Sequence, residues 1–249
     1  MNKLPQITIS FWIMKICATT LGETAGDLLA QTMKIGYAIS SAILLTFFFV
    51  SLGGQLLTKK YNPIIYWMVI LATSTAGTTM SDFMDRTLAL GYATGSLILA
   101  SLLTITLFIW NSAEKSLSVT DIKTKRGEVF YWTAILFSNT LGTALGDFLA
   151  DNSGLGFSGG AILIGGLLTL IILAYYFTKL SHILLFWFAF VLTRPFGATF
   201  GDLLTKPLEK GGLNLGTLGS STVLLVILAI LVGNEIVKQR KKVAVTPLS

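Results

Sequence analysis

The amino-acid sequence predicts an all-α, polytopic membrane protein with eight transmembrane helices, formed by four tandem helical hairpins that share one orientation. The first observation is composition: 53% of the 249 residues are hydrophobic and only 12% are charged, whereas soluble domains carry about 25% charged residues. The second is that apolar residues form long blocks, such as 38–57, 92–110 and 216–237, and about 20 apolar residues let a helix cross a bilayer. The third is an internal repeat that occurs four times.

A frame of tryptophan, glycine and aspartate defines each repeat. A glycine follows the tryptophan after ten residues and an aspartate follows that glycine after five, four times without a gap. The residues are Trp12, Trp67, Trp132 and Trp187, then Gly22, Gly77, Gly142 and Gly197, then Asp27, Asp82, Asp147 and Asp202. Such self-similarity indicates an architecture built from one supersecondary unit.

Each repeat contains two apolar segments, of which the first carries the frame and the second is almost entirely hydrocarbon. The expected helices span residues 8–31, 36–57, 63–86, 91–110, 128–150, 157–178, 182–205 and 215–237. The tryptophans are 55, 65 and 55 residues apart, and the ten extra residues fall in the charged stretch 111–128. We therefore expect a first half over residues 1–110, a cytoplasmic linker loop over 111–127 and a second half over 128–249.

The second segment of each repeat begins at a glycine. The stretches "GYAISS", "GYATGS" and "GFSGGA" begin at the same offset in the first three repeats, and "GLNLGT" matches in the fourth after one inserted residue. Within the frame, Gly22 with Gly26 and Gly142 with Gly146 form small-x3-small patterns. Such patterns let helices approach closely, so we expect the frame glycines mainly to pack helices together.

Loop charges predict that both termini are cytoplasmic. With eight spans, twelve Lys and Arg residues fall on the side of the termini and four on the other side, and the more basic side is normally cytoplasmic. Two spans per repeat make all repeats point the same way, unlike inverted repeats. We expect a ring, or a two-by-two packing, about an axis along the membrane normal. The tryptophans are expected to anchor at the cytoplasmic interface, and the Lys15 ammonium group to extend toward it.

With these features, the sequence resembles a bacterial membrane-protein family made of four tandem repeats of unknown function, each with two transmembrane segments and a characteristic tryptophan. The resemblance covers nearly the whole chain, and Trp12, Trp67, Trp132 and Trp187 match the family's tryptophan. It implies a location in the bacterial inner (plasma) membrane. It implies little chemistry, so the functional argument depends on the residues themselves.

The four frame aspartates are the first candidate functional residues. Fifteen helical residues rise about 22 Å, so each aspartate lies in the outer part of a hydrocarbon layer about 30 Å thick if its tryptophan is at the cytoplasmic interface. A charge at that depth costs several kcal/mol unless it is paired, hydrated or protonated. Because the repeats are parallel, we expect Asp27, Asp82, Asp147 and Asp202 to line a shared polar cavity.

Other oxygen-bearing side chains lie near these aspartates along the helices. Glu23, Asp85 and Asp151 are three or four residues from a frame aspartate and can share its helix face. A polar pathway on the cytoplasmic side is expected from Thr19, Thr20, Ser74, Thr75, Asn139 and Thr140. Such oxygens suit Mg²⁺, Mn²⁺, Ca²⁺ or protons rather than copper or zinc. The predicted metal ligands are Asp27, Asp82, Asp147, Asp202, Glu23, Asp85 and Asp151.

Arg194 departs from the pattern of the other repeats. Thr19, Ser74 and Asn139 hold the matching position, and Pro195 should bend or end the helix beside it. An arginine embedded in the membrane near carboxylates can act as an internal counter-ion that leaves when a cation arrives. We predict this role for Arg194.

These residues favour a membrane transporter or channel for a cation, either a divalent metal such as Mn²⁺ or Mg²⁺, or H⁺, through a carboxylate-lined central cavity. The alternative is a non-transporting scaffold or sensor whose buried aspartates only hold helices together. An enzyme is not expected, because "TAGD" and "ALGD" lack the first glycine of a Gly-x-Gly-Asp protease motif and no Gly-x4-Gly-Lys-Ser/Thr motif occurs. We expect no tightly bound cofactor and no nucleic-acid partner. The expected partners are the lipid bilayer and the cation, and a monomer and a homo-oligomer both stay open.

Overall fold

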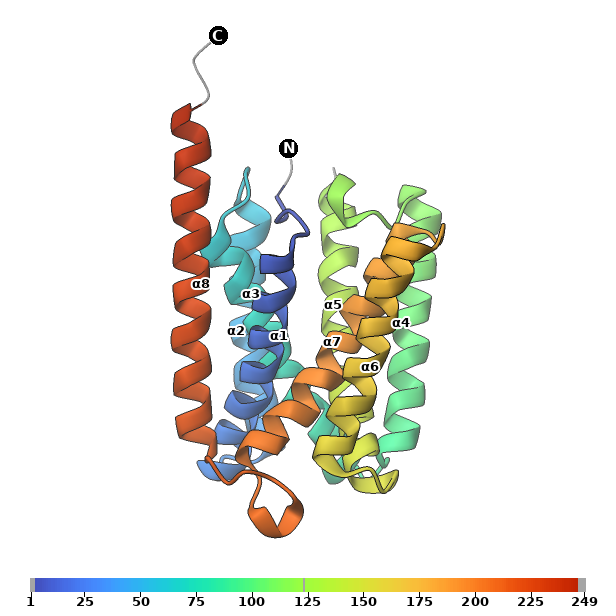
Figure 1. The fold of residues 1–249 in the computed structure, drawn as a ribbon, viewed down its shortest axis with the longest axis vertical. Helices are drawn as coiled ribbons and strands as arrows, with labels where there is room; N and C mark the ends of the chain where they lie inside the picture. Colours follow the sequence, from blue (N-terminus) through green and yellow to red (C-terminus); the bar gives the residue numbers. More distant parts are fainter. Residues whose placement is uncertain (1–2, 123, 246–249) are drawn as a thin grey trace.

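Eight α-helices dominate the computed structural model, which describes residues 3–122 and 124–245 (Figure 1). They are α1 (Ile9–Asp27), α2 (Tyr37–Leu57), α3 (Pro63–Asp82), α4 (Tyr92–Glu114), α5 (Lys125–Asp147), α6 (Gly156–Phe177), α7 (His182–Thr205) and α8 (Thr217–Val245). The described residues contain no β-strand, so the all-α fold class is confirmed. The start of α1 and the end of α8 lie at one end of the bundle, called here the terminal end, and the opposite end is called the acid end.

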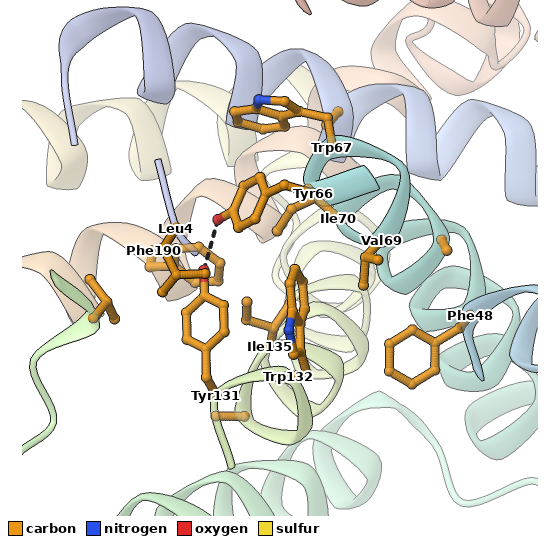
Figure 2. Packing of buried hydrophobic residues seen from close by; sticks show 14 of the residues in the cluster. Leu4, Phe48, Tyr66, Trp67, Val69, Ile70, Tyr131, Trp132, Ile135 and Phe190 are labelled. Atoms are coloured by element: carbon orange, nitrogen blue, oxygen red, sulfur yellow. Dashed lines mark hydrogen bonds between the residues drawn. The ribbon is translucent and has the colours of Figure 1, made fainter. Parts of the chain in front are cut away.

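The first helices of the four hairpins form a closed inner ring. α1 packs against α3, α3 against α5, α5 against α7, and α7 against α1. They are parallel, as the neighbours α3 and α5 show: the hydroxyls of Tyr66 and Tyr131 are 2.7 Å apart near the start of these helices, as Figure 2 shows, and Asp82 and Asp147 share Arg86 at their ends. Of the two expected packings, a ring or a two-by-two arrangement, the inner helices therefore adopt the ring.

The second helices of the hairpins form an outer layer with a cyclic offset. α2 packs on α3, α4 on α5, α6 on α7, and α8 returns to pack on α1. Each hairpin thus covers the first helix of the next hairpin, and the last covers the first. The apolar spans in α3 and α7 are 72% and 50% buried, whereas those in the outer helices are between 17% and 28% buried. The outer layer therefore presents the hydrocarbon surface, and the inner ring is free to carry polar groups.

Within the described residues, six helices are long and apolar enough to cross a membrane: α2, α3 with the turn that follows it, α4, α6, α7 and α8. The expectation of eight such helices is therefore met only in part, because α1 and α5 fall outside this set. Both belong to the inner ring and bury charged or amide side chains, among them Lys15, Glu23, Glu128 and Asn139. A helix surrounded by other helices does not need the apolar surface that lipid requires.

Side-chain caps fix where three inner helices begin. The backbone N–H of Phe11 donates to Thr8 Oγ1 at 3.4 Å, and that of Ile64 donates to Asn62 Oδ1 at 3.0 Å. The Gly127 N–H donates to Thr124 Oγ1 at 2.8 Å. These residues satisfy N–H groups that have no partner inside the helix. The Thr124 cap explains why α5 begins at Lys125, three residues before the expected start at 128.

Three inner helices continue beyond their frame aspartate as a π-helical turn. These turns are Leu28–Thr32, Phe83–Thr87 and Phe148–Asn152, after α1, α3 and α5. π-helical turns are rare and are found frequently at functional sites. α7 ends instead at Thr205, two residues before Pro207, so the fourth repeat connects to its outer helix differently.

The fourth outer helix corrects one sequence alignment. Gly36, Gly91, Gly156 and Gly216 lie at the starts of the outer helices with φ angles of 85°, 74°, 65° and 75°, a conformation that only glycine adopts without steric cost. The equivalent residue in the fourth repeat is therefore Gly216, and the match of "GLNLGT" at Gly212 is wrong. The reason is an inserted loop containing the short helix Leu208–Lys210, in which the N–H groups of Leu213 and Leu215 donate to Leu203 O and Leu204 O of α7.

The frame glycines lie where neighbouring inner helices approach most closely. A Cβ atom added to one of them would overlap or crowd one residue of the next helix around the ring. The pairs are Gly22 with Ser74, Gly77 with Asn139, Gly142 with Arg194, and Gly197 with Thr19. Each partner holds the same position in its own repeat, so the contact follows a fourfold pattern. The packing role expected for these glycines is confirmed.

Gly77→Val is expected to lower the free energy of unfolding by about 1–3 kcal/mol, because the added methyl groups must displace α5 from α3. At Gly77 a Cβ would be 3.0 Å from the Asn139 carbonyl carbon. Gly53→Val in α2 is the matched control, since nothing lies within 4 Å of a Cβ there. Thermal unfolding of the detergent-purified variants measures the difference, and equal losses would contradict the ring geometry.

Candidate cation site

The frame aspartates meet at the acid end of the inner ring. Asp27, Asp82 and Asp147 are the last residues of α1, α3 and α5, and Asp202 lies in the last turn of α7. All four are between 2% and 4% exposed. Glu23, one turn before Asp27, is also buried and joins them: one carboxylate oxygen from each of Glu23, Asp147 and Asp202 lies within 4.8 Å of the other two. These five residues are called the acid cluster.

Arg86 bridges two members of the acid cluster. Its Nε is 2.7 Å from Asp82 Oδ1 and its Nη2 is 3.2 Å from Asp147 Oδ2. Arg86 lies in the π-helical turn after α3 and its side chain is 36% exposed. The guanidinium group therefore links the ends of α3 and α5 while reaching the surface of the acid end.

Lys206 bridges the other two aspartates. Its Nζ is 2.6 Å from Asp27 Oδ2 and 3.1 Å from Asp202 Oδ1. Although burial lowers the pKa of Lys206, the carboxylates of Asp202 and Asp27 raise it more, so this pKa lies above its ordinary value and the ammonium group stays charged. Asp27 also accepts a hydrogen bond from the Gln31 amide. Lys206 thus ties α7 to α1, as Arg86 ties α3 to α5.

Sequence reasoning missed Arg86 and Lys206, which it counted only as basic residues of the loops. A signal was present, because each follows its aspartate by four residues, Asp82 with Arg86 and Asp202 with Lys206. That spacing places opposite charges within reach on a helix. Without them, Lys34 and Lys210 are the two basic loop residues left at the acid end, so the difference in basic residues between the two ends becomes larger than the loop count suggested.

Arg194 fills the centre of the ring one level above the acid cluster. It is fully buried, and its Nη2 is 3.0 Å from Glu23 Oε2. The same nitrogen donates to Thr78 Oγ1 at 2.5 Å and to Thr143 Oγ1 at 2.7 Å, and Nη1 donates to the Thr19 carbonyl at 3.3 Å. Arg194 in α7 therefore contacts α1, α3 and α5 at once. Its ion-pair partner is Glu23, and the described ion pairs of the four aspartates are with Arg86 and Lys206 instead.

The acid cluster carries more negative than positive charge. Five carboxylates face the three cations Arg86, Arg194 and Lys206, which leaves two formal negative charges when all groups are ionised. Within the acid cluster, one oxygen of Asp82 and one of Asp202 are buried and accept no hydrogen bond of good geometry from the described residues, although each is in ion-pair range of a cation. An excess of buried negative charge needs a counter-ion or protons.

Asp85 and Asp151 lie outside the acid cluster. The Asp85 carboxylate accepts from Ser81 Oγ at 3.2 Å and packs against Gly95 of α4. Asp151 is exposed and accepts from the Tyr92 hydroxyl at 3.2 Å. Both residues lie in the π-helical turns that follow α3 and α5. Neither is among the three carboxylates that approach within 4.8 Å of one another.

The residues expected to form a polar pathway bond partly within their own helix and partly to a neighbouring helix. Thr20, Thr75 and Thr140 donate their hydroxyl groups to carbonyls one turn earlier in their own helices. Thr19 donates to Thr193 O of α7 at 3.2 Å, and the Asn139 amide nitrogen of α5 donates to Thr73 Oγ1 of α3 at 2.9 Å and lies 3.4 Å from Ser74 Oγ. The bonds of Thr19 and Asn139 join neighbouring inner helices above Arg194.

Lys15 is buried inside the ring, which corrects the expectation that its ammonium group extends toward the interface. Its Nζ is 3.3 Å from Asn139 Oδ1 and 4.0 Å from the centre of the Phe190 ring. The equivalent positions in the other repeats are held by Ile70, Ile135 and Phe190, all fully buried. The glycine contacts that bring the helices together leave Lys15 pointing into the ring. Toward the terminal end the axis is therefore closed by the Lys15 side chain and bulky apolar side chains.

The tryptophans also differ from expectation. Trp67, Trp132 and Trp187 are buried among helices and do not anchor against lipid. Figure 2 shows Trp67 and Trp132 beside Tyr66 and Tyr131, and the rings of Tyr66 and Trp132 are 5.5 Å apart. Outer helices cover them: Trp67 Nε1 donates to Glu235 Oε2 of α8 at 3.0 Å. Trp12 alone among the four frame tryptophans is partly exposed.

Comparison with known proteins agrees with the repeat structure. A family model described as Repeat of Unknown Function (DUF347) matches the chain four times, over residues 10–61, 65–116, 130–181 and 185–241. No curated protein and no solved structure matches the chain. The four matches follow the four hairpins in order and leave only short segments uncovered. The protein therefore belongs to the DUF347 repeat family, as four tandem copies of its repeat.

Proposed function

We propose that this protein is a carrier that moves a cation across a membrane by way of the acid cluster. The observation that carries the proposal is the convergence of Glu23, Asp147 and Asp202, from three different inner helices, to within 4.8 Å of one another. The first candidate is a divalent metal such as Mn²⁺ or Mg²⁺, and H⁺ is the second. The cation is the cargo of the carrier and not a resident cofactor, and we propose no enzymatic activity.

The distances and charges favour a small, hard cation. Oxygen ligands bind Mg²⁺ or Ca²⁺ at about 2.0–2.6 Å, so two ligands of one ion are at most about 5 Å apart. The three carboxylate oxygens satisfy this limit. The two excess negative charges of the acid cluster match one divalent cation. Arg86, Lys206 and Arg194 act as the internal counter-ions that balance the other three negative charges, whereas the sequence suggested such a role for Arg194 alone.

The filled ring favours a carrier over an open channel. Arg194 with Thr78 and Thr143 blocks the axis directly above the acid cluster. Lys15, and the tyrosine pair Tyr66 and Tyr131, fill the axis beyond it. A cation that reaches the acid cluster from the acid end must wait for the inner helices to rearrange before it continues. We propose that the terminal end faces the cytoplasm and that the protein lies in a bacterial inner membrane. In this arrangement α1 and α5 cross the membrane together with the other six helices.

Uptake by proteoliposomes tests the proposal. Purified protein is reconstituted, and entry of Mn²⁺, Mg²⁺ and Ca²⁺ is followed with a metal-sensitive dye and entry of H⁺ with a pH-sensitive dye. We expect one of these cations to enter faster than into protein-free liposomes, and the same cation to raise the unfolding temperature of the protein in detergent. If no cation enters and none shifts the unfolding temperature, the acid cluster only holds the helices together and the protein is a scaffold or sensor.

A further inference from the structure

A cavity of about 820 Å³ lies between α1, α6 and α7, away from the acid cluster. Its walls are aliphatic and aromatic, with Ile16, Leu168, Ile171 and Phe186 among them. Ligand pockets typically have volumes of about 300–1,000 Å³, mainly apolar walls and a few polar groups. The size and lining of this cavity therefore fit a binding site for an apolar molecule.

The cavity occurs where the fourfold pattern of the outer layer is broken. Nineteen residues after each helix-start glycine, the outer helices carry Gln55, Trp110, Tyr175 and Glu235. Each outer helix packs on one inner helix, and three of these side chains also reach the next inner helix around the ring. Glu235 bonds Trp67 at 3.0 Å, the Trp110 ring is 5.7 Å from the Trp187 ring, and buried Gln55 reaches Glu128 of α5 at 3.4 Å.

The fourth side chain leaves its gap open. Tyr175 of α6 is 49% exposed, and its ring lies 4.6 Å from the His182 ring of α7. Trp67 of α3 is contacted by Glu235 of α8, but Tyr175 of α6 does not contact Trp12 of α1 in the same way. Trp12 therefore lines the cavity. The missing contact between α6 and α1 is the structural origin of the cavity.

The cavity is continuous with the apolar outer surface of the bundle. Ile13, Ile172 and Tyr176 line it and are also exposed. In a membrane these residues meet lipid chains, so hydrocarbon has direct access from the side. Apolar cavities exclude water, and an acyl chain gains the contacts that an empty cavity would forfeit.

The polar groups of the cavity lie mainly at one end, apart from Thr193 of α7, whose hydroxyl donates to the Phe190 carbonyl at 2.7 Å. Thr8, Ser118, Thr120 and His182 all lie at the terminal end, next to helix starts or in the connection between α4 and α5. Lys179, in the connection before α7, adds a positive charge near His182. Hydroxyl, imidazole and ammonium groups at the membrane surface suit the phosphate of a lipid whose chain extends down the apolar walls.

We infer that this cavity binds one phospholipid of the surrounding bilayer, with an acyl chain beside Trp12 and the phosphate at the terminal end. The site is independent of the acid cluster and of the proposed transport. Its ligand is a structural lipid held more firmly than the lipids that surround the rest of the bundle.

Native mass spectrometry of the full chain, purified in mild detergent and supplied with phosphatidylglycerol, tests the inference. We expect wild-type protein to retain one phospholipid, and Ala189→Phe, which places a ring among the cavity walls, to lose most of it. Leu163→Phe is the matched control, because Leu163 of α6 is 44% exposed and does not line the cavity. Absence of retained lipid in the wild type, or equal retention by all three proteins, would overturn the inference.

Fluorescence quenching in liposomes gives a second measurement, which does not require the lipid to remain bound during purification. Phosphatidylglycerol with brominated acyl chains should quench wild-type emission, and Trp12→Phe should remove most of the quenchable part because the other frame tryptophans are buried. Ala189→Phe should protect Trp12, while Leu163→Phe should not. If Ala189→Phe fails to fold, Ile171→Trp replaces it in the retention assay. Quenching of Trp12 that is the same in every variant indicates ordinary lipid contact and contradicts a bound lipid.

Discussion

Asp202→Asn is expected to reduce cation uptake by proteoliposomes about tenfold or more, equivalent to about 1.4 kcal/mol or more of lost binding free energy. The substitution keeps the shape of the side chain and removes one of the three carboxylates that approach within 4.8 Å. The acid cluster then holds one negative charge fewer, while Lys206 keeps its ion pair with Asp27 at 2.6 Å. The positive charges of the cluster compete more strongly with the cation, so binding and uptake fall together.

Asp151→Asn is the matched control for this experiment. It makes the same chemical change one helical turn after Asp147, but Asp151 is exposed and lies outside the acid cluster. Uptake by this variant should equal that of the wild type. An unchanged unfolding temperature for Asp202→Asn would show that lost uptake reflects lost charge. If Asp202→Asn took up the cation as fast as the wild type, the Asp202 carboxylate would have no role in transport.

Arg194→Met is expected to lower the free energy of unfolding by about 3–5 kcal/mol, because removing one partner of a buried ion pair leaves the other charge uncompensated. Arg194 and Glu23 are both buried inside the ring and 3.0 Å apart. The substitution also removes the donors to Thr78, Thr143 and the Thr19 carbonyl. Denaturant or thermal unfolding in detergent measures the loss, and Arg126→Met on the exposed start of α5 serves as the surface control.

Glu23→Gln in the Arg194→Met background distinguishes charge from packing. If the loss arises from the stranded Glu23 carboxylate, the double variant should be more stable than Arg194→Met alone, since a neutral amide is less costly to bury than an unpaired charge. A double variant that is no more stable would assign the effect to the lost hydrogen bonds from Arg194 to Thr78, Thr143 and the Thr19 carbonyl. If Arg194→Met were as stable as the wild type, the position of Arg194 at the centre of the ring would be contradicted.

The repeat and its frame allowed the sequence to predict much of the acid cluster. Parallel copies of one hairpin must place equivalent residues at equivalent depths, so the recurrence of Asp27, Asp82, Asp147 and Asp202 indicated that they would meet. Glu23 joins them because it lies one turn away on the same α-helix. Spacing alone did not place Asp85 and Asp151, whose carboxylates accept from Ser81 and Tyr92 outside the acid cluster.

The cations of the site were harder to identify from the sequence. Arg86 and Lys206 follow the frame aspartates at the ends of inner helices, where basic residues usually belong to loops. Lys15 resembles many membrane lysines whose ammonium group reaches the interface, but the ring encloses it. Whether a basic side chain reaches water or a buried carboxylate depends on which helices surround it, and that is a property of the assembled ring.

The sequence by itself determined the number of hairpins, their common direction and the shared level of their aspartates, because these follow from periodicity and from the length of a helix. The tertiary structure decided that the second helix of each hairpin covers the first helix of the next, that Arg194 pairs with Glu23, and that α6 leaves a cavity beside Trp12. The physical reason is that local spacing fixes the face and depth of a residue along one helix, whereas its partner is fixed by the close approach of helices at glycines, which depends on all four repeats packing at once.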